Sequence, residues 1–317
     1  MLKLISKGIS MCKRILKYIS NECYRFDINT YLGLYNKMDD SKFIRRKFKL
    51  KMQKDLNLNS PSSFNEKLQW LKLYDRNELY TTLVDKIAVK EYVSKKIGEQ
   101  YIIPTIRVWH SPKEIDFDSL PDKYVLKCNH NSGGLCICKD KQKFNIRKAR
   151  KTLEKGMKYN FYLLGREWPY KNVPRKIFAE QYLENSESGG LTDYKIHCFN
   201  GKPKFVLVCQ DRFAETGLTE DLFTIDWEHM EVKRPNHNNS KLPISKPDKL
   251  EEMLSIAEKL SNGIPFVRVD LYFVEGNIFF SELTFFPASG FIPFEPEEWD
   301  KTFGDWLVFP NKTEISE

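Results

Sequence analysis

The chain has 317 residues, enough for one large domain or two smaller ones with a substantial buried core. Its composition, with 41% hydrophobic and 14% aromatic residues, excludes a chain that is disordered throughout. The net charge of +8 is concentrated at one end, because residues 1–60 hold 14 Lys and Arg against 5 Asp and Glu. A nucleic-acid-binding protein would more often spread positive charge over a folded surface, so we expect no nucleic-acid partner.

Residues 2–19 have the pattern of a basic amphipathic helix, whose apolar stripe comprises Leu2, Ile5, Ile9, Cys12, Leu16 and Ile19. Two interpretations are open: contact with an anionic membrane surface, or packing on the protein's own body with a solvated basic face. No stretch reaches the roughly 18 apolar residues of a membrane span. Lysines also interrupt any secretory signal. We therefore expect a cytoplasmic protein, with the inner face of the cell membrane as the surface that residues 2–19 would contact.

Helices are expected first along the chain. Ser63-Phe-Asn-Glu66 has the spacing of a capping box and predicts a helix to about Tyr74. A second helix is predicted over 77–96, with Asp85 and Lys86 inside it. Further helices are predicted over 144–155 and 248–261.

Strand patterns dominate from residue 101 onward, and two tight turns, Asn200-Gly201 and Glu275-Gly276, predict antiparallel hairpins. The order of elements predicts an α+β fold. The expected strands are 101–109, 123–128, 135–138, 176–183, 194–198, 203–209, 265–274 and 277–283.

The last hairpin carries candidate metal ligands. If its strands pair through the tight turn, Asp270 lies roughly opposite Glu282, with Arg268 and Thr284 on the same faces as these acids. Two carboxylates at short range repel unless a cation lies between them. Mg²⁺ is commonly held by one or two carboxylates together with phosphate oxygens. Apolar neighbours favour a buried Mg²⁺ site over two solvent-facing acids on an edge hairpin.

Lys127 ends an apolar strand directly before a loop that contains Ser132-Gly133-Gly134. A lysine there either meets an anion or reaches solvent at the strand end. Glycines let backbone N–H groups approach phosphate oxygens. The loop follows the lysine, which argues against a P-loop, and no GxGxxG motif supports a dinucleotide site. His130 beside the loop would contact phosphate or pack the loop.

Together these motifs resemble the TupA-like ATP-grasp family over roughly residues 40–310. The matching stretches are Phe64-Asn-Glu-Lys-Leu-Gln-Trp70, Val84-Asp-Lys86, Tyr124-Val-Leu-Lys-Cys-Asn-His-Asn-Ser-Gly-Gly134, Asp193-Tyr-Lys195, Cys198-Phe-Asn-Gly201, Arg268-Val-Asp-Leu-Tyr272 and Glu282-Leu-Thr-Phe285. The resemblance implies an ATP-grasp fold in which two α+β subdomains grip ATP. We expect a basic helical region at 1–60, the N-terminal part of the grasp with its phosphate loop at 61–183, and the C-terminal part with the metal site at 184–317.

The resemblance also implies roles for individual residues. Lys86 and Lys127 resemble the lysines that hold the ATP phosphates, under a flap formed by Ser132, Gly133 and Gly134. The stretch Glu180-Gln-Tyr182-Leu183 resembles the hinge beside adenine, where Glu180 accepts from the amino group and Leu183 offers its N–H. Further roles fall to Asp193 (ribose, or ordering of Lys195), Lys195 (ATP), Arg268 (a tetrahedral intermediate), and Asp270, Glu282 and Thr284 (metal).

Two departures from the ATP-grasp pattern stand out. Many ATP-grasp ligases have Asn at the position of Thr284, which leaves the number and placement of metal ions open. Only about 60–80 largely helical residues precede the grasp, so the acceptor must be bound differently from ligases with an α/β domain there.

The implied activity is an ATP- and Mg²⁺-dependent carboxylate–amine ligation through an acylphosphate. The family resemblance implies that an amino acid or peptide is joined to a sugar acid or glycan of capsule or surface polysaccharide. A kinase-like phosphotransferase of the same fold is an alternative, and a stable phosphoester product would distinguish it. A glycosyltransferase or a nonenzymatic assembly factor is a third class, for which the triplet Asp116-Phe-Asp118 is the one metal-binding candidate.

Overall fold

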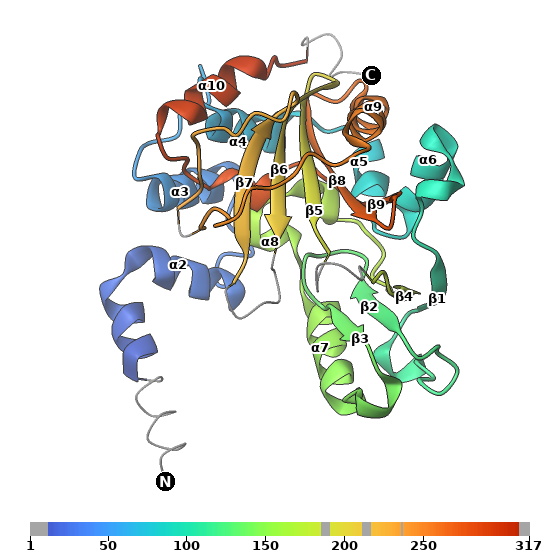
Figure 1. Cartoon of the computed structure of the whole chain (residues 1–317). Coiled ribbons are helices and arrows are strands. Elements are labelled where there is room, and N and C mark those ends of the chain that lie inside the picture. Colours follow the sequence, from blue (N-terminus) through green and yellow to red (C-terminus); the bar gives the residue numbers. More distant parts are fainter. Residues whose placement is uncertain (1–11, 185–190, 211–216, 236, 311–317) are drawn as a thin grey trace.

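The computed structural model describes residues 12–184, 191–210, 217–235 and 237–310. It contains two antiparallel sheets that lie one below the other, with helices around them (Figure 1). The large sheet has the order β7-β6-β5-β8-β9 and the small sheet the order β1-β4-β2-β3. The predicted α+β fold is therefore present. The strands are β1 (Thr105–Trp109), β2 (Tyr124–Cys128), β3 (Cys136–Cys138), β4 (Ile177–Gln181), β5 (Asp193–Phe199), β6 (Lys202–Gln210), β7 (Thr219–Thr224), β8 (Phe266–Val274) and β9 (Asn277–Thr284).

The large sheet is covered on one face by α9 (Leu250–Ser261), which contacts β5, β6 and β8. Side chains alternate along a strand, so Ile196 and Cys198 of β5 point to this face, where the Cys198 thiol lies 3.8 Å from the Ala257 carbonyl oxygen. Lys195 and His197 of the same strand point to the other face. The polar side chains of the sheet gather on that face. Strand β7 was not predicted. It pairs with β6 at the edge of the sheet and contains two buried acids, Glu220 and Asp221.

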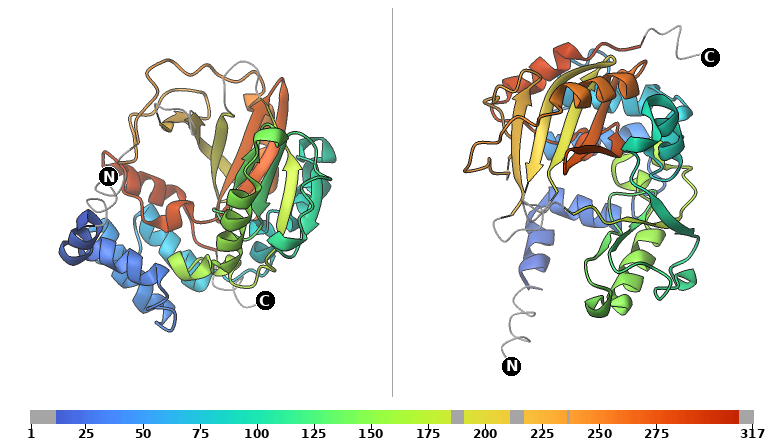
Figure 2. Two further views of the ribbon diagram at one scale, coloured as in Figure 1. Left: turned by 90° about the horizontal axis from the view of Figure 1, so that it is seen from below. Right: turned by 45° about the vertical axis from the view of Figure 1, so that its right-hand side comes forward.

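The small sheet is covered by α7 (Ile146–Lys158), which contacts β2 and β3. Trp109, Tyr124, Leu126 and Leu153 form a separate core between this helix and the sheet. The small sheet and α7 lie below the large sheet in Figure 1 and in the right view of Figure 2.

The N-terminal region has a core of its own. Helices α2 (Glu22–Tyr31) and α3 (Asp40–Met52) pack through Phe26, Phe43 and Phe48, and Phe291 from the C-terminal part of the chain joins them. Figure 2, left, shows these helices and the small sheet on opposite sides of the molecule. The region thus packs against the body through a residue nearly 250 positions away in sequence.

Helix α4 (Phe64–Tyr74) begins with the predicted capping box, in which the Ser63 hydroxyl accepts from the Glu66 N–H and the Glu66 carboxylate accepts from the Ser63 N–H. It packs against α10 (Glu298–Trp306), and Asp300 accepts two hydrogen bonds from Asn65. The remaining short elements are α8 (Tyr162–Gly165) and the 3₁₀ turns η1 (Glu99–Tyr101), η2 (Pro112–Glu114), η3 (Lys141–Lys143), η4 (Trp168–Tyr170) and η5 (Pro287–Gly290).

The single helix predicted over 77–96 is wrong, because the chain breaks at Asp85-Lys86. Helix α5 (Leu79–Val84) ends before the break and α6 (Ala88–Ile97) begins after it. The Asp85 carboxylate accepts from the N–H groups of Ile87, at 2.9 Å, and of Ala88, at 3.3 Å. Asp is a preferred residue for satisfying free N–H groups at the start of a helix, so it starts a new helix here.

Candidate active site

Charged side chains form rows across the face of the large sheet that is turned away from α9. Strand pairing places Lys195 beside Asp270, and Asp270 beside Glu282, on three neighbouring strands. The next row runs from His197 through Arg268 to Thr284. The expected opposition of Asp270 and Glu282 is present, and a bulge directly after this pair shifts the register beyond it.

Cations of the protein surround the two acids. Asp270 is 1% exposed and accepts from Arg268 Nε at 2.6 Å, Arg268 Nη2 at 2.7 Å and Lys195 Nζ at 2.6 Å. Glu282 accepts from Lys86 Nζ at 2.8 Å, and Arg268 Nη2 lies 3.6 Å from it. The expectation of two mutually repelling bare carboxylates is therefore wrong, because three cations already balance their charge.

The same cations set the ionisation of Glu282. Burial alone would raise the pKa of this carboxyl, but the positive charges of Lys86, Arg268 and Lys195 outweigh burial and hold the pKa well below its ordinary value. Glu282 therefore stays ionised at neutral pH, as a metal ligand must be.

The donor set fits Mg²⁺. Two carboxylates face each other, and the Thr284 hydroxyl lies 3.3 Å from Glu282 Oε1 and accepts from Arg268 Nη2 at 3.1 Å. Across the part of the chain that the structure describes, no group of three or more His, Cys, Asp or Glu side chains is placed to hold a metal. A metal at this pair would thus take its other ligands from phosphate and water, which is common for Mg²⁺.

Lys127 extends from β2 toward Glu180 on the neighbouring strand β4, with 2.5 Å between Nζ and Oε2. A second lysine, Lys90 of α6, binds the other oxygen at 2.6 Å and also donates to the Thr105 hydroxyl at 2.8 Å. Burial would raise the pKa of Glu180, but the two lysines lower it. Both Glu180 oxygens are thus engaged by lysines, and its role beside adenine stays a prediction.

Lys90 was missed because it lies in an amphipathic helix, where a lysine ordinarily faces solvent. Only the contact of α6 with the small sheet reveals it. Tyr182 and Leu183 of the predicted hinge are half-buried, and their role beside adenine also stays a prediction. Asp193 is buried, and Lys195 Nζ lies 3.7 Å from its carboxylate.

Asn129 at the end of β2 connects the phosphate-binding candidates. It is fully buried, and its side-chain amide donates to Asp85 and to the Pro174 carbonyl, both at 2.9 Å. Its side-chain oxygen accepts from the Lys176 N–H at 2.7 Å, and its backbone carbonyl accepts from the Lys86 N–H at 3.2 Å. Asn129 therefore fixes the position of Lys86 relative to Lys127 on the same strand end.

The loop after Asn129 contains two glycines, of which one has no room for a side chain and the other has open space around it. Gly134 has a φ of +71°, and a Cβ there would lie 2.7 Å from the Cys128 sulfur, so no side chain fits. Gly133 has open space around it and, like Ser132, is exposed, as a flap that approaches a ligand with its backbone requires. His130 is buried between Asn129 and Asn131, and burial lowers its pKa to about 4. It packs the loop as a neutral side chain.

A second buried charge cluster lies behind β9 and was not found from the sequence. Lys72 of α4 is fully buried and donates to the carbonyls of Gly165, at 2.8 Å, and Ser289, at 2.6 Å, and to Gln69 Oε1, at 2.9 Å. The Ser289 hydroxyl donates to the buried Glu167 carboxylate. Ala288 and Ser289 both have positive φ, at 46° and 58°, in the turn that follows β9. The cluster thus holds a strained turn close to the acid pair.

A small antiparallel sheet that carries Lys127, together with a larger sheet that carries an acid pair bound by Lys86, is the arrangement expected of the ATP-grasp class. The TupA-like ATPgrasp family matches residues 66–308, and the chain belongs to this family. The predicted family and its ATP-grasp fold are thereby confirmed. A search of curated proteins gave no match.

Solved structures of ATP-grasp ligases are distantly similar. The D-alanine–D-alanine ligase from Bacillus anthracis complexed with ATP has 14% identity and a TM-score of 0.38, covering 71% of this chain and 58% of that one. The corresponding Helicobacter pylori ligase has 13% identity and a TM-score of 0.41, covering 78% and 70%. The ligase PsnB complexed with minimal precursor, Mg and ADP has 11% identity and a TM-score of 0.36, covering 69% and 57%. The chain thus spans less than two thirds of the first and third of these structures.

Proposed function

We propose that this protein is a ligase that uses ATP and Mg²⁺ to join a carboxylate to an amine. The observation that carries the proposal is the row of Lys195, Asp270 and Glu282, with Arg268 bound to Asp270 and Lys86 to Glu282. In the proposed reaction a carboxylate oxygen attacks the γ-phosphorus and ADP leaves. The amine then attacks the acyl carbon, phosphate leaves, and the nitrogen loses a proton.

The residues of the chain would bind and orient the reactants. Lys86 and Lys127 each have three N–H donors and only one carboxylate partner among the described residues, so each retains donors for phosphate oxygens. Arg268 is held by the two hydrogen bonds that it donates to Asp270, so its charge is fixed where negative charge develops on the substrate. Mg²⁺ bound by Asp270, Glu282 and Thr284 would neutralise phosphate charge.

For the substrates, we propose an amino acid or peptide as one partner and a sugar acid or glycan of surface polysaccharide as the other. Family membership supports this assignment. The test is a reaction with ATP, Mg²⁺, mixed amino acids and galacturonate, analysed by mass spectrometry. An amide with free phosphate is expected, whereas a stable phosphoester would make the protein a phosphotransferase.

The glycosyltransferase alternative has no support in the geometry of its triplet. Asp116 Oδ1 accepts from the Asp118 N–H at 3.1 Å, which is a local turn, and both acids are exposed while Phe117 between them is buried. This arrangement serves the loop itself.

We expect Lys127→Ala to weaken ATP binding by about 1.5–3 kcal/mol, the range for a hydrogen bond to a charged group. Lys123→Ala, four residues earlier on the same segment, is the matched control, because Lys123 pairs with Glu184 at the surface. Calorimetry with MgATP measures both. Equal affinity of the two variants would contradict the assignment of Lys127.

We also propose peripheral contact with an anionic membrane on its cytoplasmic side. No described helix is long and apolar enough to cross a bilayer. Residues 12–20 are helical. Leu16 and Ile19 of the predicted stripe are 64% and 67% exposed, and Ile15 beside them is 51% exposed, so this part of the stripe is not packed on the body. Residues 2–11 of the stripe lie outside the described residues. Lys13, Arg14 and Lys17 supply charge for anionic lipid.

Leu16→Glu with Ile19→Glu should reduce sedimentation with vesicles of anionic lipid by about tenfold, since two apolar anchors are lost. Neutral vesicles are the control, and ATP turnover without vesicles should not change. Deleting residues 2–20 should have the same effect. Unchanged sedimentation with anionic vesicles would refute the membrane contact.

A further inference from the structure

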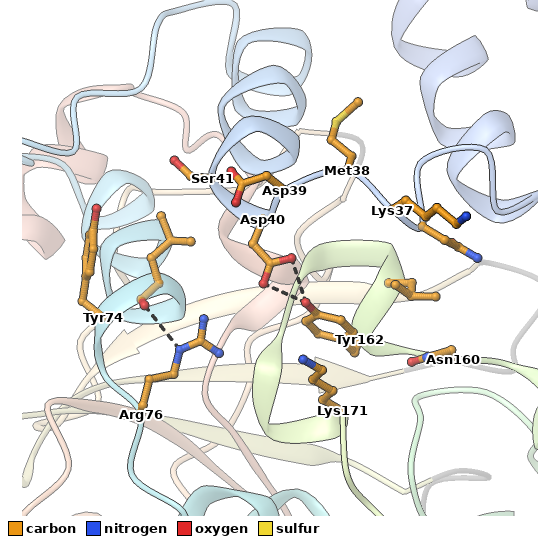
Figure 3. A pocket seen from close by; sticks show the side chains of 13 residues that line it. Lys37, Met38, Asp39, Asp40, Ser41, Tyr74, Arg76, Asn160, Tyr162 and Lys171 are labelled. Carbon is orange, nitrogen blue, oxygen red and sulfur yellow. Dashed lines mark hydrogen bonds between the residues drawn. The ribbon is translucent and has the colours of Figure 1, made fainter.

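A cavity of about 650 Å³ lies where the N-terminal region meets the segment that precedes β4 (Figure 3). Its walls are the turn before α3, the C-terminal end of α4, and residues 160–171 with α8. None of the residues proposed for ATP or metal lines it.

Three cations line this cavity: Lys37, Arg76 and Lys171. In the described part of the chain, none of the three is within ion-pair distance of a carboxylate. Arg76 Nε donates to the Leu73 carbonyl at 3.3 Å, and Lys171 Nζ lies 5.4 Å from the Tyr162 ring centroid. Their positive charge is therefore available to an anion.

The two acids of the cavity are already engaged. Asp39 accepts from the Lys42 N–H at 3.0 Å as the N-cap of α3. Both oxygens of Asp40 accept from the Tyr162 hydroxyl at 2.7 Å, and Arg166 lies 3.4 Å from one of them (Figure 3). Both acids thus have hydrogen-bond partners, whereas the three cations have no carboxylate partner among the described residues. This arrangement favours a negatively charged ligand.

Neutral polar groups complete the lining. The Asn36 and Asn160 amides offer both donors and acceptors, and the Ser41 hydroxyl offers one more of each. Tyr74 is 44% exposed and presents a ring and a hydroxyl. Amides and hydroxyls suit the many hydroxyls of a sugar, an aromatic ring suits its flat apolar face, and the cations suit carboxylates attached to it.

The turn η4 leads directly into the wall of the cavity. Tyr170 of η4 is half-buried, and burial and the charges of Glu167 and Glu282 raise the pKa of its hydroxyl, with Asp270 contributing less. The next residue, Lys171, lines the cavity. Of two consecutive residues, one thus lines the cavity and the other lies within electrostatic range of the acid pair.

We propose that this cavity binds an acidic sugar unit of the acceptor, with Arg76 and Lys171 as the main carboxylate partners. The statement that this ligand is the acceptor rests on the proposed ligase function. The binding itself needs neither ATP nor turnover.

The experiment is calorimetry of the full chain with trigalacturonate, and with the neutral sugar maltotriose, in the absence of ATP. We expect trigalacturonate to bind and maltotriose to bind at least tenfold more weakly. Arg76→Gln and Lys171→Gln should each lower the trigalacturonate affinity by about tenfold. Lys113→Gln, at an exposed lysine of η2 that does not line the cavity, is the control and should change nothing.

A variant that is expected to bind trigalacturonate more tightly distinguishes an effect of charge from damage to the fold. Asp39→Asn keeps a good N-cap but removes one negative charge, so trigalacturonate should bind severalfold more tightly. Equal binding of the two sugars, no binding of trigalacturonate, or full affinity in Arg76→Gln and Lys171→Gln would each overturn the proposal. Formation of ADP and amide is measured separately, so loss of the ligase activity with trigalacturonate binding intact would refute the proposed function alone.

Discussion

Asp270→Asn and Glu282→Gln should each reduce ATP turnover by several orders of magnitude, because each removes ligand charge where phosphate must be neutralised. The two side chains are paired across β8 and β9, and no group of three or more described His, Cys, Asp or Glu side chains could hold a metal in their place. Stabilisation by MgATP, measured as a shift in Tm, should largely vanish in both variants. Asp226→Asn, at an exposed acid, is the control. Near-normal turnover of either variant would place the metal site elsewhere.

The stability of the same variants without ligand should fall, and more for Asp270→Asn. Removing the buried Asp270 charge leaves Arg268 and Lys195 without their closest anion, at a cost of about 3–5 kcal/mol. Glu282 is 30% exposed at its side chain, so its loss should cost less. If the acids repelled each other as bare carboxylates, stability would rise instead. Urea unfolding of the two variants without nucleotide distinguishes the two outcomes.

The pH dependence follows from the lowered pKa of Glu282. A carboxyl whose folded pKa lies below the unfolded value stabilises the fold above about pH 4.5, and this contribution is lost as the pH falls further. The wild type should thus lose stability below pH 4.5 more steeply than Glu282→Gln. Tm measured from pH 6 to pH 3 checks the difference.

Lys72→Met should destabilise the protein by about 3–5 kcal/mol, the largest effect we expect outside the acid pair. The substitution leaves the Gly165 and Ser289 carbonyls without a donor and Glu167 as a buried acid without its neighbouring cation. Adding Glu167→Gln should recover part of the loss, since it removes the unpaired charge. Urea unfolding of the single and double variants measures the coupling. A loss below 1 kcal/mol would contradict a structural role for the cluster.

The Lys72 cluster also predicts a rise in stability with pH. Burial lowers the pKa of Lys72 to about 7, so between pH 7 and about 10.5 the unfolded chain binds more protons than the folded one. Stability should increase with pH across this window in the wild type and not in Lys72→Met. The raised pKa of Glu167 acts in the opposite sense, and only at lower pH.

Local rules predicted much of the fold and the acid pair. Two-residue turns set the register of a hairpin, which is why Asp270 and Glu282 were placed opposite each other correctly, and the capping box at Ser63 started α4 as expected. The break at Asp85 was missed because it is stabilised by Asn129, which is 44 residues away in sequence. Lys90 and Lys72 were missed for a similar reason. Each lies in a helix and is distinguished from a solvated lysine only by the distant segment that packs against it.

The contacts of Asn129 and Lys90 restrict how the two sheets can move against each other. Val84 and Val89, on either side of Asp85-Lys86, belong to the core of the large sheet, whereas Asn129 ends a strand of the small one. Lys90 makes a second link, from α6 to Glu180 of the small sheet. Both links lie beside Lys86 and Lys127, the lysines proposed to bind phosphate, so we expect any opening of the small sheet to turn about this point. Lys86 and Lys127 would then keep their spacing while the exposed tip at Gly133 travels furthest.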